Sequence, residues 1–306
     1  MSDPMDILIL GGAGQVGTEL QAPGLWGANV RLHAPTRGEL DITDGAALAA
    51  ALGQRAYAAV VNTAAYTAVD KAESDIAAAW SLNAVAPALL AAATARAGIP
   101  LVHVSTDYVF DGAGTGACTP ETPVNPRSVY GASKAAGEMA VRSANPRHAI
   151  IRTAWVVSPH RGNFVKTMLR LSAERDRLSV VDDQHGNPTS AGDLAAGLAV
   201  IAQRLATDPG APTGTHHFVN AGATTWCGFA RGIVAAAARR GGRDIPVDPI
   251  PTSAFPTPAR RPANSQLSTQ SLAQAYGLTP RPWTEALEDI LDRLIGPGQQ
   301  PKETQA

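Results

Sequence analysis

The sequence predicts an α/β fold in which a doubly wound parallel sheet is followed by a smaller C-terminal lobe. Two observations carry this prediction. Short apolar runs alternate with helix-forming stretches over residues 1–155, and a glycine-rich turn, Gly11–Gly17, follows the first of these runs. After Trp155 the alternation weakens, and six prolines crowd the stretch Ile245–Pro262, which therefore cannot stay regular for long.

The composition is typical of a soluble globular protein. Of 306 residues, 45% are hydrophobic and 17% are charged, and the net charge is −1. No basic run is present, so nucleic acid is not an expected partner. The N-terminus is acidic where a signal peptide is basic, and no apolar run reaches the roughly 18 residues of a membrane span. We therefore expect a cytoplasmic protein without a membrane partner, and the two distant cysteines suit a reducing compartment.

The glycine-rich turn indicates a dinucleotide. Ile7–Leu10 is expected to be a buried parallel strand, and Gly11, Gly14 and Gly17 follow it at G-x-x-G-x-x-G spacing before a helix begins. Glycine tolerates positive φ and lets the backbone approach a pyrophosphate, which free N–H groups of the following helix can bind. We therefore expect a Rossmann-type dinucleotide-binding domain over residues 1–155.

The end of the second strand bears on the choice of cofactor. This strand is expected at Asn29–His33, and a carboxylate at its end would bind the ribose 2′-hydroxyl of NADH. The chain instead has Ala34 there, with Arg37 close behind, and a guanidinium could pair with a 2′-phosphate. We expect NADPH to be preferred, although NADH could also serve; the alternative is that Arg37 is only a solvated loop cation.

Polar residues also follow the next two strands. Ala58–Asn62 leads into Thr63–Thr67, and Leu101–Val104 leads into Ser105, Thr106 and Asp107. Ligands of an open α/β sheet bind at the carboxyl ends of its strands, so both segments are expected at the binding edge. The two hydroxyls could equally be turn or cap groups.

A tyrosine and a lysine four residues apart carry the candidate chemistry. The alanines around them favour helix, so Tyr130 and Lys134 should share a face one turn apart. A nearby ammonium would lower the pKa of the phenol from about 10 toward working pH, and such a tyrosine could exchange a proton with a carbonyl oxygen. The alternative is a surface helix with an accidental Tyr/Lys pair.

The remaining elements follow from periodicity, caps and breakers. A helix should open after Asp41–Asp44, with Thr43 or Asp44 as its cap. Further helices are expected over Ser74–Ala97, Asn163–Glu174, Ala191–Leu205, Phe229–Arg240 and Thr284–Leu294, further strands over Ala149–Thr153 and Leu178–Val181, and loops over Asp111–Pro126 and Gln184–Thr189. Residues 156–296 should be mainly a substrate-binding lobe, with some segments returning to the sheet, and residues 297–306 a flexible tail.

Several motifs together resemble one family. They are Gly11-x-x-Gly14-Gln15-Val16-Gly17, Asn62–Glu73, Ser105–Gly112, Tyr130-x-x-x-Lys134, Arg152-Thr153-x-Trp155, Asn163-Phe164, Asp183–Thr189 and Arg261-Pro262. The glycine turn and the Tyr/Lys pair resemble the extended short-chain dehydrogenases/reductases as a whole. The longer blocks resemble, within that superfamily, the dTDP-4-dehydrorhamnose reductases, and the likeness covers nearly the full length.

The resemblance implies an NAD(P)H-dependent oxidoreductase that reduces the 4-keto group of dTDP-4-dehydro-L-rhamnose to dTDP-L-rhamnose. It implies a catalytic triad of Thr106, Tyr130 and Lys134. Cofactor contacts are expected from Gly11, Gly14, Gln15, Val16, Gly17, Arg37, Asp41, Ile42, Ala65, Tyr66, Thr67, Val104, Tyr130 and Lys134. Contacts with the dTDP-sugar are expected from Thr106, Asp107, Trp155, Asn163 and Arg261. Arg261 is a candidate for the diphosphate because guanidinium forks match phosphate oxygens, the alternative being a solvated basic turn.

Other readings stay open. Some relatives hold Mg²⁺ through glutamates at a contact within a homodimer; Glu19 matches one of those positions, whereas Gly192 stands at another. The enzyme could instead be another nucleotide-4-ketosugar reductase or an epimerase of deoxysugar assembly. The chain could also be a non-catalytic NADP-binding regulatory subunit, similar to the β subunit of methionine adenosyltransferase. A pure binding module would not need Thr106, Tyr130 and Lys134 together, which favours an enzyme.

Overall fold

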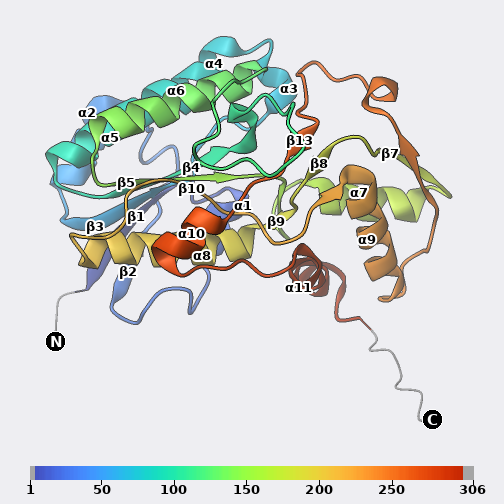
Figure 1. Ribbon diagram of the computed structural model, residues 1–306. Coiled ribbons are helices and arrows are strands. Elements are labelled where there is room, and N and C mark those ends of the chain that lie inside the picture. The colour runs from blue at the N-terminus through green and yellow to red at the C-terminus, as the bar shows by residue number, and fades with distance from the viewer. Residues whose placement is uncertain (1–3, 299–306) are drawn as a thin grey trace.

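A six-stranded parallel sheet forms the centre of the computed structural model, which describes residues 4–298 (Figure 1). The strands, in chain order, are β1 (Met5–Leu10), β2 (Val30–His33), β3 (Tyr57–Asn62), β4 (Leu101–Thr106), β5 (His148–Thr153) and β10 (Gly214–His217), and their order across the sheet is β10-β5-β4-β3-β1-β2. All neighbouring strands are parallel, so their carboxyl ends lie at one edge. Because β2 and β3 flank β1 on opposite sides, the end of β1 is the switch point where such sheets bind ligands.

Alternation along the strands produces two hydrophobic layers. Ile7 and Ile9 pack with helices on one face of the sheet, and Leu8 and Leu10 pack with helices on the other. The first face carries α1 (Gln15–Leu20), α8 (Ala191–Thr207) and α10 (Gln270–Tyr276), and the second carries α2 (Gly45–Gly53), α5 (Ala86–Arg96) and α6 (Val129–Ala144). Figure 1 shows α2, α5 and α6 on one side of the sheet and α8 on the other. The predicted doubly wound α/β fold is confirmed.

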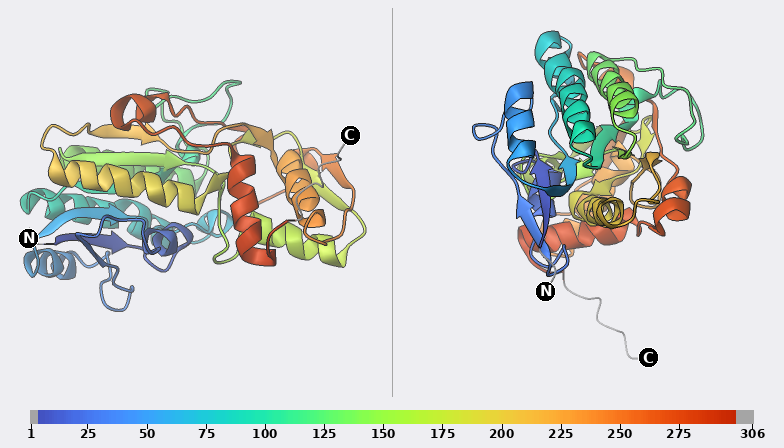
Figure 2. Two further views of the ribbon diagram at one scale, coloured as in Figure 1. Left: turned by 90° about the horizontal axis from the view of Figure 1, so that it is seen from below. Right: turned by 90° about the vertical axis from the view of Figure 1, so that its left-hand side faces the viewer.

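A second apolar cluster lies beside the sheet. It contains Phe229 and Leu291 and joins α7 (Phe164–Glu174), α9 (Trp226–Ala238) and α11 (Trp283–Ile295) to the strand pair β7 (Leu178–Val181) and β12 (Val247–Ile250). In the left-hand view of Figure 2, α11 lies between the central sheet and the helices α7 and α9. Two small sheets are formed by β6 (Val156–Val157) with β9 (Thr189–Ser190), and by β8 (His185–Gly186) with β11 (Thr224–Thr225) and β13 (Asn264–Ser265). The division into a dinucleotide-binding and a substrate-binding part stays a prediction.

Some elements differ from the expectation. The helix expected over Ser74–Ala97 follows α3 (Val69–Ala72) and consists of α4 (Ile76–Trp80), a π-helical segment (Ser81–Val85) and α5. Its run Ile76–Arg96 is long and apolar enough to cross a membrane, but α5 packs in the core against the sheet. The strand β10 and the helix α10 are not among the predicted elements, β8 lies in the expected loop Gln184–Thr189, and β9 begins at the last residue of that loop. Single 3₁₀ turns lie at Asp107–Val109 and Thr252–Ala254. Residues 299–306 of the predicted tail lie outside the described residues.

Candidate active site

The glycine turn brings the end of β1 against the segment that follows β3. Gly11 has a φ of +82°, and a Cβ at this residue would lie 2.5 Å from the backbone nitrogen of Ala64. A Cβ at Gly17 would lie 2.1 Å from the carbonyl oxygen of Gly11. Neither position has room for a side chain, and Gly14 at the top of the turn is exposed. The turn therefore fits a dinucleotide pyrophosphate, with Gln15 and Val16 at the start of α1.

Two hydroxyl groups meet at the carboxyl end of β4. Thr106 is the last residue of β4, and Tyr130 lies in the first turn of α6, which Ser128 caps. Both residues are buried, and Thr106 lies close enough to Tyr130 to act on the pKa of its phenol. The hydroxyl of Thr106 also donates to the Asp107 carboxylate at 2.9 Å. The ring of Tyr108 packs edge-on against that of Tyr130, with 5.4 Å between the centroids.

Lys134 lies one turn after Tyr130, and its ammonium donates to the carbonyl oxygen of Val104 at 2.7 Å. Burial lowers the pKa of Lys134 to about 8, although the charge of Glu138, one turn further along α6, acts to raise it. Glu138 is fully buried and accepts two hydrogen bonds from Arg152 of β5, at 2.8 and 2.7 Å. Burial works to raise the pKa of Glu138, but the hydrogen bonds and the charge of Arg152 outweigh burial and lower it.

The predicted effect of Lys134 on the tyrosine is wrong. Burial raises the pKa of Tyr130; hydrogen bonding with Thr106 opposes this only in part, and the charge of Asp107 adds to it. Burial, and not the charge of Lys134, decides the pKa of the phenol, and the Lys134 ammonium is turned to the Val104 carbonyl. Tyr130 is consequently a neutral phenol at working pH, ready to donate a proton rather than to accept one.

Asp107 is a second buried acid beside these hydroxyls. It is 4% exposed, and burial raises its pKa to about 6, while hydrogen bonds with Ser265 and Thr106 act to lower it. Ser265 belongs to β13, so a residue from the C-terminal half contacts the end of β4. The sequence gives no sign of this serine, because nothing in its surroundings marks it as close to Asp107.

Asn83 holds the loop that follows β3. Its Oδ1 accepts from the N–H of Tyr66 at 2.8 Å, and its Nδ2 donates to the Tyr66 carbonyl at 3.0 Å and to the Ser133 hydroxyl at 3.1 Å. Ala65 and Tyr66 are half-buried, and Thr67 is exposed. Asn83 therefore fixes this loop relative to α6, and it lies in the π-helical segment, a feature that is frequent at functional sites. Sequence reasoning missed Asn83, because an asparagine inside an apolar helix could be anywhere on its surface.

Arg37, Asp41 and Ile42 lie beyond the end of β2. Arg37 is exposed, and its Nε donates to Asp41 at 3.4 Å. Hydrogen bonds from the N–H and hydroxyl of Thr43 lower the pKa of Asp41. Ile42 is buried, and Asp44 rather than Thr43 caps α2. An exposed guanidinium, paired with the Asp41 carboxylate, therefore lies where the adenosine end of a cofactor is expected.

Two of the predicted substrate residues are engaged with protein groups. Trp155 has a φ of +48° and stacks on Trp226, with 3.7 Å between ring centroids and an interplanar angle of 13°. Asn163 caps α7, and its Nδ2 donates to the side-chain oxygen of Gln15 at 3.0 Å. Asn163 therefore lies next to the glycine turn, whereas Trp155 lies at the junction with the second apolar cluster.

Arg261, the third of these residues, reaches the site from the proline-rich segment. Its guanidinium pairs with Asp70 at 2.6 Å and donates to the hydroxyl of Tyr108 at 2.9 Å. Since Tyr108 packs against Tyr130, Arg261 brings a positive charge within one side chain of the buried hydroxyls. The structure thus brings together Thr106, Asp107, Tyr130 and Arg261.

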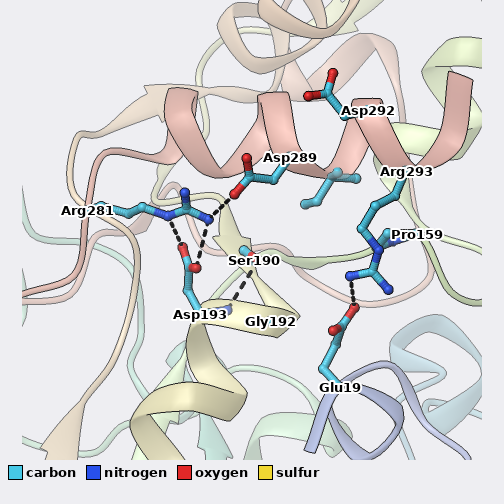
Figure 3. A pocket seen from close by; sticks show the side chains of 10 residues that line it. Glu19, Pro159, Ser190, Gly192, Asp193, Arg281, Asp289, Asp292 and Arg293 are labelled. Carbon is cyan, nitrogen blue, oxygen red and sulfur yellow. Dashed lines mark hydrogen bonds and ion pairs between the residues drawn. The ribbon is translucent and has the colours of Figure 1, made fainter. Parts of the chain in front are cut away.

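The residues around Glu19 do not fit a Mg²⁺ site (Figure 3). The Glu19 carboxylate pairs with Arg293 of α11 at 2.7 Å. His160, which is not drawn in this view, lies 3.0 Å from the same carboxylate. Gly192 faces this carboxylate without a side chain: a Cβ there would lie 3.6 Å from Glu19 Oε2. Between residues 4 and 298, no group of three or more His, Cys, Asp or Glu side chains is arranged to hold a metal. The expectation of Mg²⁺ is therefore not supported, and the cavity of about 420 Å³ at this place is lined by none of the predicted catalytic residues.

Known proteins resemble this chain over nearly its whole length. The family model described as RmlD substrate binding domain matches residues 5–295. A dTDP-4-dehydrorhamnose reductase from Sinorhizobium fredii is 39% identical and covers 96% of this chain and 99% of its own length. One from Burkholderia thailandensis is 43% identical, with 92% and 97% covered.

Solved structures give the same result. The dTDP-4-dehydrorhamnose reductase of Clostridium acetobutylicum superposes with a TM-score of 0.88 at 39% identity, covering 95% of this chain and 99% of its own. That of Bacillus anthracis, in complex with NADP, gives 0.87 at 32% identity and the same coverage. From these matches and the arrangement of its polar residues, the chain belongs to the RmlD substrate binding domain family, the family of the dTDP-4-dehydrorhamnose reductases.

Proposed function

We propose that this chain reduces the 4-keto group of dTDP-4-dehydro-L-rhamnose with NADPH, giving dTDP-L-rhamnose. The observation that carries the proposal is the buried pair of neighbouring hydroxyl residues, Thr106 and Tyr130, with Lys134 one turn beyond, in a chain of this reductase family. The relative from Bacillus anthracis was solved with NADP, which supports NADPH as the cofactor.

The buried hydroxyls suit the reduction of a ketone. When bound, NADPH supplies a hydride to the carbonyl carbon of the sugar. Negative charge then develops on the carbonyl oxygen, and the Tyr130 hydroxyl donates its proton to that oxygen. The Thr106 hydroxyl, whose single proton is donated to Asp107 in the free protein, would turn to donate it to the same oxygen and stabilise the charge as it forms. Because burial keeps the phenol protonated, the raised pKa of Tyr130 agrees with its role as donor.

The cofactor would lie along the carboxyl edge of the sheet. Lys134 would hold the ribose next to the nicotinamide, and Arg37 would bind the 2′-phosphate. The glycine turn, Gly11, Gly14, Gln15, Val16 and Gly17, would carry the pyrophosphate; Asp41 and Ile42 would contact the adenine, and Ala65, Tyr66, Thr67 and Val104 the nicotinamide side.

The sugar nucleotide would lie opposite the cofactor. Thr106 and Asp107 would contact the reacting sugar, and Trp155 and Asn163 would border it. Arg261 would face the diphosphate, whose charge matches a guanidinium fork. If the Arg261 guanidinium moved from Asp70 to the diphosphate, it would exchange one anionic partner for another, so its positive charge would stay compensated.

A direct spectrophotometric assay tests the proposal. The purified protein is mixed with NADPH and dTDP-4-dehydro-L-rhamnose; loss of the reduced nicotinamide absorbance is followed, and the product is identified by NMR. We expect stoichiometric oxidation of NADPH and dTDP-L-rhamnose as the product. Turnover of the sugar without net loss of NADPH would indicate an epimerase or dehydratase, and binding of NADPH without any turnover would indicate a regulatory subunit. A homodimer and a cytoplasmic location stay predictions.

A further inference from the structure

A loop from the second half of the chain, residues 158–163, is hydrogen-bonded to the glycine turn. It is named the 158–163 loop. The side-chain oxygen of Gln15 accepts from the Ser158 hydroxyl at 2.8 Å and from the Asn163 amide at 3.0 Å. His160 of the same loop pairs with Glu19 of α1 at 3.0 Å. The loop therefore has a fixed position relative to the turn that would carry the cofactor pyrophosphate.

Arg161 is the unusual residue of this loop. Its φ is +53°, a left-handed conformation that L side chains rarely adopt. Its Nε donates to the carbonyl oxygen of Ala13 at 2.8 Å, which holds the guanidinium directly at the glycine turn. Both Ala13 and Gly14 are exposed, so this side of the turn is open.

The rest of the guanidinium is unused. Within residues 4–298, neither Nη group of Arg161 makes a hydrogen bond, and the guanidinium forms no ion pair with a carboxylate. The one acid of α1, Glu19, is already paired with Arg293 and in contact with His160. A cation with four free N–H donors is therefore held at a backbone turn that fits a pyrophosphate. If the loop only had to be attached to the turn, a backbone contact would be enough, and a glycine at residue 161 would adopt the same φ with less strain than the arginine.

We propose that Arg161 binds the pyrophosphate of the nicotinamide cofactor through its two Nη groups, so that the 158–163 loop completes the cofactor site. This inference rests on the proposed function. The planar guanidinium fork matches pairs of phosphate oxygens, and the bond from Nε to Ala13 orients the fork before the cofactor arrives. The role goes beyond that of Arg37, because the pyrophosphate is common to NADPH and NADH whereas the 2′-phosphate is not.

The test is the Arg161→Gly variant of the full chain, measured by isothermal titration calorimetry with NADPH and with NADH. Glycine keeps the left-handed backbone and removes only the side chain, so the thermal midpoint should be equal to that of the wild type or higher. We expect the Kd to rise about tenfold or more, by the same factor for both cofactors. Arg161→Lys, which keeps the charge but loses the fork, should lie between.

Two control variants sharpen the result. Arg170→Ala removes an exposed arginine of α7 that pairs with Glu174, and it should change neither Kd. Arg37→Ala should raise the Kd for NADPH alone. The inference is overturned if Arg161→Gly binds both cofactors like the wild type, or if it weakens the binding of NADPH alone. It is also overturned if the thermal midpoint of Arg161→Gly falls together with its affinity, because Arg161 would then stabilise the fold rather than bind the cofactor. Failure of the wild type to bind either cofactor would instead refute the proposed function.

Discussion

Replacing Glu138 with glutamine should destabilise the protein strongly, because it breaks a fully buried ion pair. The side chains of Glu138 and Arg152 are 0% and 2% exposed, and two hydrogen bonds of 2.7 and 2.8 Å join them. Removing one partner of such a pair leaves a buried charge without compensation, which costs about 3–5 kcal/mol. For a chain of this size each kcal/mol lowers the thermal midpoint by roughly 2 °C, so we expect a fall of roughly 6 °C or more.

The assay for Glu138→Gln is thermal or urea unfolding followed by circular dichroism, with Glu174→Gln as the matched control. Glu174 also pairs with an arginine, Arg170, but both side chains are more than half exposed, so its loss should leave the midpoint nearly unchanged. Glu138→Gln also removes the charge that supports protonation of Lys134, so cofactor affinity near the lysine pKa of about 8 should weaken. A midpoint within about 1 °C of the wild type would refute this reasoning about the buried pair.

Three further predictions follow from the same contacts. Excess Mg²⁺ or EDTA should not shift the thermal midpoint, because Arg293 already neutralises Glu19, whereas a clear rise with Mg²⁺ would reveal a cation site. Burial lowers the pKa of His217 from 6.5 to about 3, so the folded protein favours the neutral imidazole. The free energy of unfolding should therefore be full above pH 6.5 and fall by about 1.4 kcal/mol per pH unit below it. In urea unfolding at a series of pH values, His217→Asn should make this fall less steep. Arg261→Ala should raise the KM for the sugar nucleotide about tenfold with little change in Kd for NADPH, and an unchanged KM would remove Arg261 from the diphosphate site.

Much of the sheet could be predicted from residue patterns. Ile7–Leu10 and Leu101–Val104 are apolar runs because both faces of their strands are buried, and the polar residues after them fall at one edge because the strands are parallel. The strand β10 could not be predicted in this way. Gly214–His217 contains no aliphatic residue, and it becomes a strand only because β5 offers it an edge to pair with.

The site was less accessible to sequence reasoning, because its electrostatics depend on burial. The spacing of Tyr130 and Lys134 is right, but spacing does not reveal that the ammonium binds the Val104 carbonyl and that burial decides the phenol pKa. Asn83 and Arg161 were missed for a related reason. Each acts on a segment far from it in the chain, and only the folded backbone shows the contact.

The most direct measurement is single-turnover reduction of dTDP-4-dehydro-L-rhamnose by the NADPH-loaded Tyr130→Phe variant, compared with the wild type in a stopped-flow instrument. If a buried neutral phenol supplies the proton, the variant should bind NADPH with unchanged Kd and lose hydride transfer by about a hundredfold or more. Hydride transfer at a rate near that of the wild type would contradict the account, because the protein would then reduce the ketone without its buried donor.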